Sequence, residues 1–146
     1  MNQMDKERVK KYDMPEGNME EVVKGYQETA IDKIKEFTKV QFLHWTQEEF
    51  TCCFRKMLTL EQYRNPEISR LYQKYLAGDP LLYIEEIFRG FIDNDQEARQ
   101  LALDFYGPIF LLYSIYDGAE NKEIIVEQVG QHVDRFSKML LAKEGR

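Results

Sequence analysis

The chain has 146 residues, of which 43% are hydrophobic and 32% charged, and its formal net charge is -6. These values are those of one globular domain that can bury a core without a metal or a disulfide. An acidic surface repels nucleic acid phosphates, and no apolar run approaches the ~20 residues that span a bilayer, so direct DNA contact and membrane insertion are not expected. The first residues show no signal peptide, which predicts a cytoplasmic location.

Helix signals follow one another along the chain, and no alternating apolar and polar run is bounded by turn pairs. The sequence therefore predicts an all-α fold of about seven helices. Residues 3–12 make a first short, polar helix with few apolar anchors. Asn18 and Glu21 form a capping-box pattern, which opens a long helix that ends near Trp45.

A second capping-box pattern, Thr46 and Glu49, starts the next helix, which ends near Arg64. Its apolar residues recur at helical spacing, so one face of this helix is expected to point inward. The residues expected on that face are Phe50, Cys53, Phe54, Met57 and Leu58.

Two prolines mark the starts of the following helices. Asn65-Pro66 supplies a cap and then a proline at the first helical position, and Gly78 stops the helix that follows. Asp79-Pro80 repeats the signal and starts a helix that runs to about residue 93.

The central helix, residues 94–118, is amphipathic in its first half and apolar on every side from Phe105 to Tyr116. Such a helix has to be covered on two sides, and a large apolar patch usually marks an interface. We expect one side to face the chain's own core and the other a second copy; the alternative is a buried core helix with a bend. Gly107 and Pro108 in its middle predict a kink, which leaves room for a cavity.

The last helix, which begins at Asn121, carries a narrow apolar seam close to coiled-coil periodicity. A narrow seam suits helix pairing, so this helix and the central helix could form a four-helix interface between two chains. The seam consists of Ile125, Val129, Val133, Phe136 and Leu140.

Sequence signatures of catalysis and of cofactor binding are missing. The chain has no glycine-rich phosphate loop and no nucleophile elbow. A di-iron bundle would need Glu three residues before His, but Gln41 precedes His44 and Val129 precedes His132. We therefore predict no enzymatic activity, no cofactor and no metal.

Aromatic residues are concentrated between the end of the long helix and the central helix. Tyrosines suit the wall of a ligand pocket because each has an apolar body and a polar tip. The cluster indicates a small-molecule pocket; an aromatic core is the alternative, because stripes at helical period are usually packing.

The order of the helices and several local phrases resemble a known family. The segments are FRKMLTLEQYRNPEISRLYQKYLAGDPLLYIEEIF, then ALDFYGPIFLLYSIYDG, then a last helix that ends HVDRFSKMLL. From about Met19 to Leu141 they resemble the C-terminal effector-binding and dimerisation domain of TetR-family transcriptional repressors. The resemblance implies an all-helical bundle, a homodimer through its last two long helices, and a ligand cavity enclosed by the helices before them. The family's N-terminal helix-turn-helix domain, which binds DNA, is not found before Met19.

Residues and resemblance together predict a ligand-binding and dimerisation domain over residues 18–146. Residues 1–17 would form a short polar helix and turn, the remnant of a connecting helix. The function would be to sense a small apolar or aromatic effector as a homodimer, within a bacterial transcriptional regulator that binds DNA only through a head not present in this chain. The pocket candidates are Gln41, Trp45, Phe54, Met57, Tyr72, Tyr83, Phe105, Ile109 and Tyr113, and the dimer candidates are Tyr106, Phe110, Val129, Val133, Phe136 and Leu140.

Tyr113 could belong to either surface. The alternative function is a headless dimerisation module that pairs with full-length relatives and binds no ligand; a cavity filled by its own side chains would favour it. An enzyme built in the aromatic pocket is a third interpretation, for which the sequence offers no paired acid and base, nucleophile or metal set.

Overall fold

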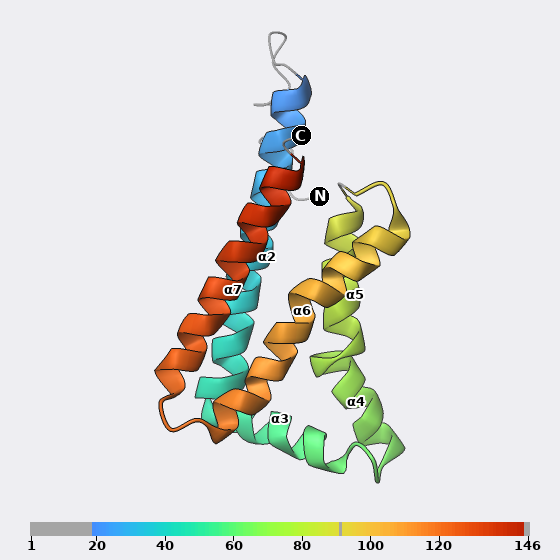
Figure 1. The fold of residues 1–146 in the computed structure, drawn as a ribbon. Helices are drawn as coiled ribbons and strands as arrows, with labels where there is room; N and C mark the ends of the chain where they lie inside the picture. Colours follow the sequence, from blue (N-terminus) through green and yellow to red (C-terminus); the bar gives the residue numbers. More distant parts are fainter. Residues whose placement is uncertain (1–18, 91, 145–146) are drawn as a thin grey trace, which may run out of the picture.

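The computed structural model describes residues 19–90 and 92–144. Within them the chain forms six helices and no strand (Figure 1), so the all-α prediction is confirmed. The expected count of about seven differs from the six described helices, because the expected helix over residues 3–12 and the Asn18 cap lie outside the described residues. The helices are α2 (Met19–Gln47), α3 (Glu49–Glu61), α4 (Pro66–Leu76), α5 (Gly78–Arg89), α6 (Asp95–Gly118) and α7 (Lys122–Glu144).

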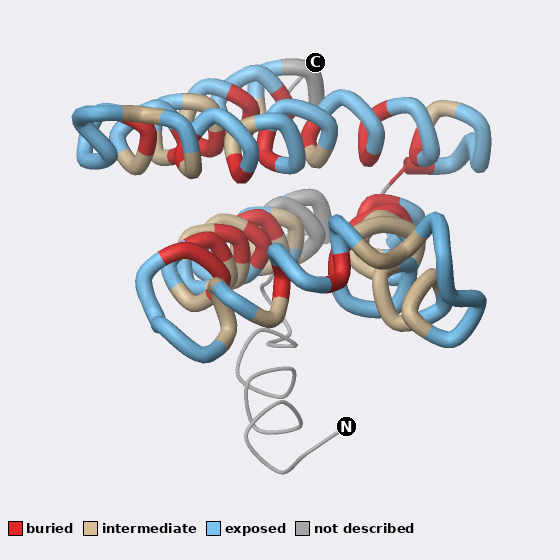
Figure 2. The backbone as a smooth tube through the Cα atoms, turned by 90° about the horizontal axis from the view of Figure 1, so that it is seen from below, coloured by how far each residue is buried: buried red, intermediate tan, exposed pale blue. Residues whose placement is uncertain are grey.

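The helices form an elongated bundle around α6. In Figure 1, α2 and α7 run side by side on one flank of α6, α4 and α5 lie on the other, and α3 crosses one end of the bundle. Buried positions face the interior of this arrangement (Figure 2). None of the described helices is long and apolar enough to cross a membrane.

Two of the predicted helix starts are built by asparagine side chains. Asn65 Oδ1 accepts hydrogen bonds from the backbone amides of Glu67 and Ile68, at 2.9 and 3.4 Å. Asn94 Oδ1 accepts one from the amide of Glu97, at 3.0 Å. Each bond satisfies an amide in the first turn that has no partner within its own helix.

Two further predicted caps, Thr46 and Asp79, are wrong. Thr46 lies in the last turn of α2, where its hydroxyl donates to the carbonyl of Phe42 at 2.6 Å, and Glu48 precedes α3 without a side-chain cap. Likewise, α5 already begins at Gly78, so Asp79 lies in its first turn instead of preceding it. In both places the first helical turn forms without the side chain that the sequence pattern singled out.

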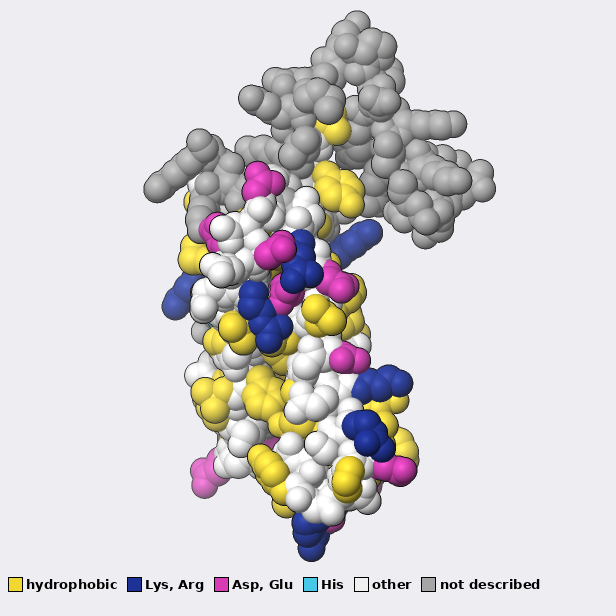
Figure 3. All heavy atoms as spheres, turned by 90° about the vertical axis from the view of Figure 1, so that its right-hand side faces the viewer, with side chains coloured by type: hydrophobic (Ala, Val, Ile, Leu, Met, Phe, Trp, Pro, Cys, Tyr) yellow, Lys and Arg dark blue, Asp and Glu magenta, His cyan; other side chains and the backbone are white. Residues whose placement is uncertain are grey.

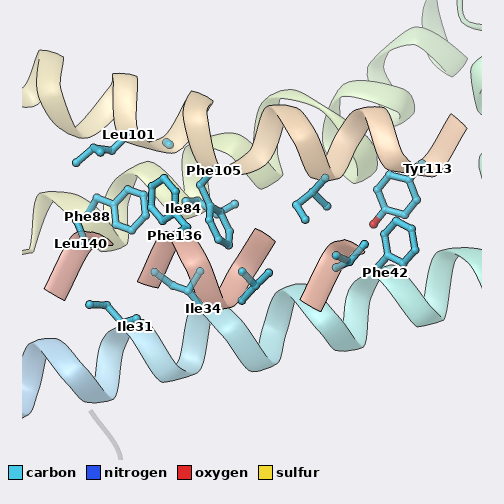
Figure 4. Close-up of a cluster of buried hydrophobic side chains, with 14 of the residues drawn as sticks. Ile31, Ile34, Phe42, Ile84, Phe88, Leu101, Phe105, Tyr113, Phe136 and Leu140 are labelled. Carbon is cyan, nitrogen blue, oxygen red and sulfur yellow. The ribbon is translucent and has the colours of Figure 1, made fainter. Parts of the chain in front are cut away.

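One face of α6 lies at the centre of the hydrophobic core (Figure 4). The Phe105 ring, with 2% of its surface exposed, lies 5.0 Å from the ring of Phe136 and 6.4 Å from that of Phe88, measured between centroids. Burying a phenylalanine side chain stabilises a fold by about 1.5–3 kcal/mol. This contact therefore holds α5, α6 and α7 together.

The seam of α7 is covered within the chain. Val129, Val133, Phe136 and Leu140 are buried among residues of α2 and α6. This corrects their placement at a dimer interface: in this arrangement a second copy cannot cover them. The reason is that helical periodicity shows which stripe is covered and does not show which helix covers it.

Tyr106 is likewise turned inward. Its hydroxyl donates to the carbonyl of Leu76, at the end of α4, at 2.5 Å, and burial raises the pKa of the phenol. Its predicted place on a dimer surface is therefore corrected, because the phenol satisfies a carbonyl at the end of α4. Phe110, by contrast, remains exposed on α6.

Pro108 lies inside α6, where its lack of an N–H removes the hydrogen bond to the carbonyl of Asp104. Beside this point the Nε2 atom of His132 hydrogen-bonds the carbonyl of Phe105, at 2.8 Å. The imidazole of α7 thus binds the backbone of α6 at the turn that the proline weakens.

Candidate functional site

The orientation of α3 differs in part from the predicted one: Leu58 is buried and Phe54 packs against the core as expected, but the other three predicted residues are not covered. Phe50, Cys53 and Met57, which were expected to point inward, are exposed, and Phe50 retains 80% of its surface. The side chains of α3 that are buried are Arg55 and Leu58, with only 4% of Arg55 exposed. A buried arginine requires partners, so its hydrogen bonds decide which face of α3 points inward.

Arg55 connects three helices. Its Nε donates to the carbonyl of Trp45 in α2 at 3.0 Å, and its two terminal nitrogens donate to the two carboxylate oxygens of Asp117 in α6, at 2.9 and 2.7 Å. Its guanidinium carbon lies 5.3 Å from the centroid of the Tyr113 ring. The bidentate pair fixes the end of α6 against α3 and the end of α2.

Arg55 stays positively charged. Burial acts to lower the pKa of Arg55, but the hydrogen bonds and the negative charge of Asp117 outweigh it, and the pKa is raised. Burial also raises the pKa of the neighbouring Tyr113 phenol, so that side chain is neutral. The cluster therefore consists of a bound ion pair and a neutral phenol, a composition suited to positioning groups more than to transferring protons.

A groove of about 420 Å³ runs between α3, α4 and α6 beside this ion pair. Its size falls within the range of about 300–1,000 Å³ typical of small-molecule sites. Most of its wall is apolar or aromatic, and a few polar side chains lie at one end. The lining residues are Arg55, Lys56, Thr59, Leu60, Tyr72, Leu76, Phe110, Tyr113, Ser114 and Asp117.

A second, much smaller cavity of about 40 Å³ lies on the inner side of Tyr113. It is surrounded by side chains of α2, α4, α5 and α6 and has room for no more than a few water molecules. Its polar lining is satisfied in part by the indole nitrogen of Trp45, which donates to Gln41 Oε1 at 3.1 Å. Tyr113 therefore lines both the groove and the cavity.

Five of the predicted pocket residues meet at these two spaces. Gln41, Trp45, Ile109 and Tyr113 line the small cavity. Tyr72 and again Tyr113 line the groove. Burial raises the pKa of Tyr72, so its hydroxyl is a neutral donor and acceptor there.

The other four lie elsewhere. Phe54 stacks on Trp45 with ring centroids 6.4 Å apart, and Met57 is exposed on α3. Tyr83 packs against Phe37 at 4.9 Å and lines a separate hollow between α2 and α5. Phe105 belongs to the main core, because the rings of Phe88 and Phe136 cover it.

The polar residues of the groove were missed in the sequence. The available signal was a charge that interrupts an apolar helix: Arg55 in α3 and Asp117 at the end of the apolar half of α6. A charge on a face that is otherwise buried needs a partner of opposite sign, although the sequence does not show which residue that partner is. The remaining groove residues that the prediction did not include are Lys56, Thr59, Leu60, Leu76 and Ser114, together with Phe110, which was placed at the dimer surface.

Among the described residues there is no group of three or more His, Cys, Asp and Glu that could hold a metal ion. In the same part of the chain, every buried side-chain nitrogen or oxygen has a hydrogen-bond partner. Comparison with protein-family models, with curated proteins and with solved structures finds no match for this chain. Its function therefore has to be inferred from the groove, the cavity and the surface.

Proposed function

We propose that this chain is the small-molecule-sensing, dimerising domain of a TetR-like transcriptional regulator, whose DNA-binding head lies outside these 146 residues. The observation that carries the proposal is that Tyr113 lies between two spaces. It lines both the groove and the inner cavity, and it belongs to α6, whose opposite side exposes apolar residues. The proposal includes no catalytic activity.

The groove is the proposed effector site. Tyr72 and Phe110 meet edge to face there, with ring centroids 6.3 Å apart, and Leu76 adds aliphatic surface. Such walls bind small apolar or aromatic compounds by burying their surface, and each buried CH₂ contributes about 0.8 kcal/mol. The adjoining cavity leaves the inner side of the Tyr113 ring incompletely packed, so a small shift of this side chain would accompany filling of the groove.

The proposed dimer surface is the outer side of α6 near its turn into α7. Leu111 and Ile115 of α6 and Ile124 of α7 are exposed there, and Leu111 retains 59% of its surface. The opposite flank of the molecule, formed by α4 and α5, instead shows hydrophobic side chains interspersed with many charges (Figure 3). Exposed apolar side chains one turn apart on the outer side of α6 support pairing with a second copy.

Coupling between the two surfaces would pass through α6. A ligand that displaces Tyr113 or strains the bond between Arg55 and Asp117 would favour another tilt of α6, and that tilt changes the dimer surface. A ligand with different affinities for two such arrangements shifts the population between them. In the complete regulator, that shift would alter the spacing of the DNA-binding heads.

Native mass spectrometry tests the proposal, because it reports subunit number and bound small molecules together. We expect a dimer for the natural sequence and a monomer for Leu111→Glu, since the new carboxylate would be buried without a partner. Leu82→Glu, which changes another exposed leucine on α5, is the matched control and should stay dimeric. A monomer for the natural sequence at micromolar concentration would contradict the proposal.

A second candidate, a module that pairs with related chains without binding a ligand, is favoured by a different observation. The inner cavity holds only about 40 Å³, α3 exposes Phe50 and Leu60, and the turn after α3 exposes Tyr63. In this case no small molecule would change the dimer, and Phe50→Ser would weaken pairing with a related chain. Unchanged pairing of that variant would exclude α3 as the contact.

A further inference from the structure

The groove has a charged end and an apolar end. Along α6 the lining changes from Phe110 to Ser114 and then to Asp117, a distance of about 10 Å at 1.5 Å per residue. On α3 the lining residues are Arg55, Lys56, Thr59 and Leu60. The order along α6 is fixed by the contacts of Phe110 with Tyr72 at one end and of Asp117 with Arg55 at the other.

The polar end of the groove carries a net positive charge. Arg55 and Asp117 neutralise each other, and every nitrogen of Arg55 already has a hydrogen-bond partner. Lys56, which also lines the groove, has no carboxylate of the described residues within ion-pair distance. The groove therefore carries one available positive charge, in a chain whose net charge is -6.

Two hydroxyl groups line the groove together with this lysine. Ser114 on α6 and Thr59 on α3 line the same groove. The Thr59 hydroxyl donates its proton to the carbonyl of Arg55 at 2.8 Å, so its oxygen offers only acceptor positions. An ammonium group together with a free serine hydroxyl is a donor set for an anion, and a charge-assisted hydrogen bond is roughly twice as strong as a neutral one.

We propose that the effector of this groove is a free organic acid with one negative charge, whose anionic group binds Lys56 and Ser114 and whose apolar body lies against Phe110, Tyr72 and Leu76. This rests on the proposed sensor function and adds the ligand class. A neutral analogue loses the ion pair. A cationic analogue meets Lys56 with like charge, which excludes it from the polar end.

Three probes of equal length test the charge preference: octanoate, 1-octanol and octylammonium, titrated into ¹⁵N-labelled protein while amide shifts are followed by NMR. We expect octanoate to move amides of α3, α4 and α6 and to bind about tenfold more tightly than 1-octanol, as one charge-assisted hydrogen bond predicts. Octylammonium should bind no more tightly than 1-octanol. Equal dissociation constants for octanoate and 1-octanol would overturn the charge preference and leave the apolar groove in place.

Two substitutions in the groove and one control locate the residues that cause the preference for an anion. Lys56→Gln should weaken octanoate binding about tenfold and leave 1-octanol unchanged, because it removes only the charge. Lys138→Gln, a change at an exposed lysine of α7, is the matched control and should alter neither. Phe110→Ala should weaken both ligands. An unchanged octanoate constant for Lys56→Gln would overturn the assignment of the anion site.

Two further outcomes separate the remaining possibilities. If none of the three probes moves the amides around the groove, both this proposal and the effector site of the proposed function fail. Binding to anionic phospholipid vesicles without binding of free octanoate would place the same anion chemistry in a lipid headgroup and overturn the assignment to a free acid. We expect no co-sedimentation with such vesicles.

Discussion

The two flanks of α6 are built in different ways. Towards α2 and α7 the helix is covered by closely packed apolar side chains, with Phe105, Val133 and Leu140 nearly inaccessible. Towards α3 and α4 it is held by directed polar bonds, from Arg55 to Asp117 and from Tyr106 to Leu76, with open space between them. A filled core resists displacement, whereas a few directed bonds beside an open groove allow two arrangements. The difference indicates that ligand-dependent motion, where it occurs, starts on the α3 side.

Deleting one phenylalanine from each flank tests the comparison with the largest expected effect. Phe105→Ala should lower the free energy of unfolding by about 3–5 kcal/mol, because it leaves a cavity in the packed core. Phe110→Ala, at a half-exposed ring in the groove, should cost about 1 kcal/mol. Urea denaturation measures both, and equal losses would show that the flanks do not differ.

The ion pair is the main bond of the open flank, so Arg55→Met should cost about 3 kcal/mol by leaving Asp117 and the Trp45 carbonyl without their donor. A double-mutant cycle with Asp117→Asn measures the interaction of the two side chains. Arg70→Met, at an exposed arginine of α4, is the control and should change stability by less than about 0.5 kcal/mol. Additive losses in the cycle would mean that the pair does not hold α6.

His132→Ala should cost about 1–1.5 kcal/mol, because it removes the bond to the Phe105 carbonyl beside Pro108. Hydrogen exchange should speed up in the adjacent turn of α6 and remain unchanged in α4. The exposed neighbour Gln131, replaced by Ala, provides the control. Identical hydrogen-exchange rates in His132→Ala and Gln131→Ala would show that His132 does not stabilise that turn.

The smallest expected effect is a gain on the filled flank. A Cβ at Gly130 of α7 would meet no atom within 4 Å, so Gly130→Ala should stabilise the protein by about 0.5–1 kcal/mol through helix propensity alone. At Gly78 the added carbon would lie 3.2 Å from the Gln73 side-chain oxygen, and no such gain is expected. The midpoints of thermal unfolding of Gly130→Ala and Gly78→Ala compare the two positions. A lower midpoint for Gly130→Ala would reveal packing around α7 that is tighter than described.

The fold was predictable where its causes are local. Asn65 and Asn94 bond to amides two and three residues away, so the sequence pattern alone marks those helix starts. Thr46 misled because a threonine hydroxyl can also bond backwards to the carbonyl four residues earlier, as it does to Phe42. Local patterns cannot decide between two local bonds of similar strength.

The site was less predictable because its causes are distant in the sequence. The orientation of α3 depends on Arg55 and Asp117, which lie 62 positions apart. The seam of α7 was found correctly as a buried stripe, but nothing in its spacing distinguishes coverage by α2 and α6 from coverage by another chain. The TetR-like sensor, the homodimer and the effector remain predictions for the experiments above.

The length of α2 has a mechanical consequence. Its first buried side chain among those described is Ile31, and the turn before it lines only the shallow hollow against α5, while the other end of α2 is held by the bond from Arg55 to the Trp45 carbonyl. A rigid rod converts a small rotation at its fixed end into a longer travel at its free end. For 29 residues, or roughly 40 Å of helix, a tilt of about 5° moves the far end by roughly 4 Å. Because α2 packs along α7, such a tilt would have to carry the two helices together.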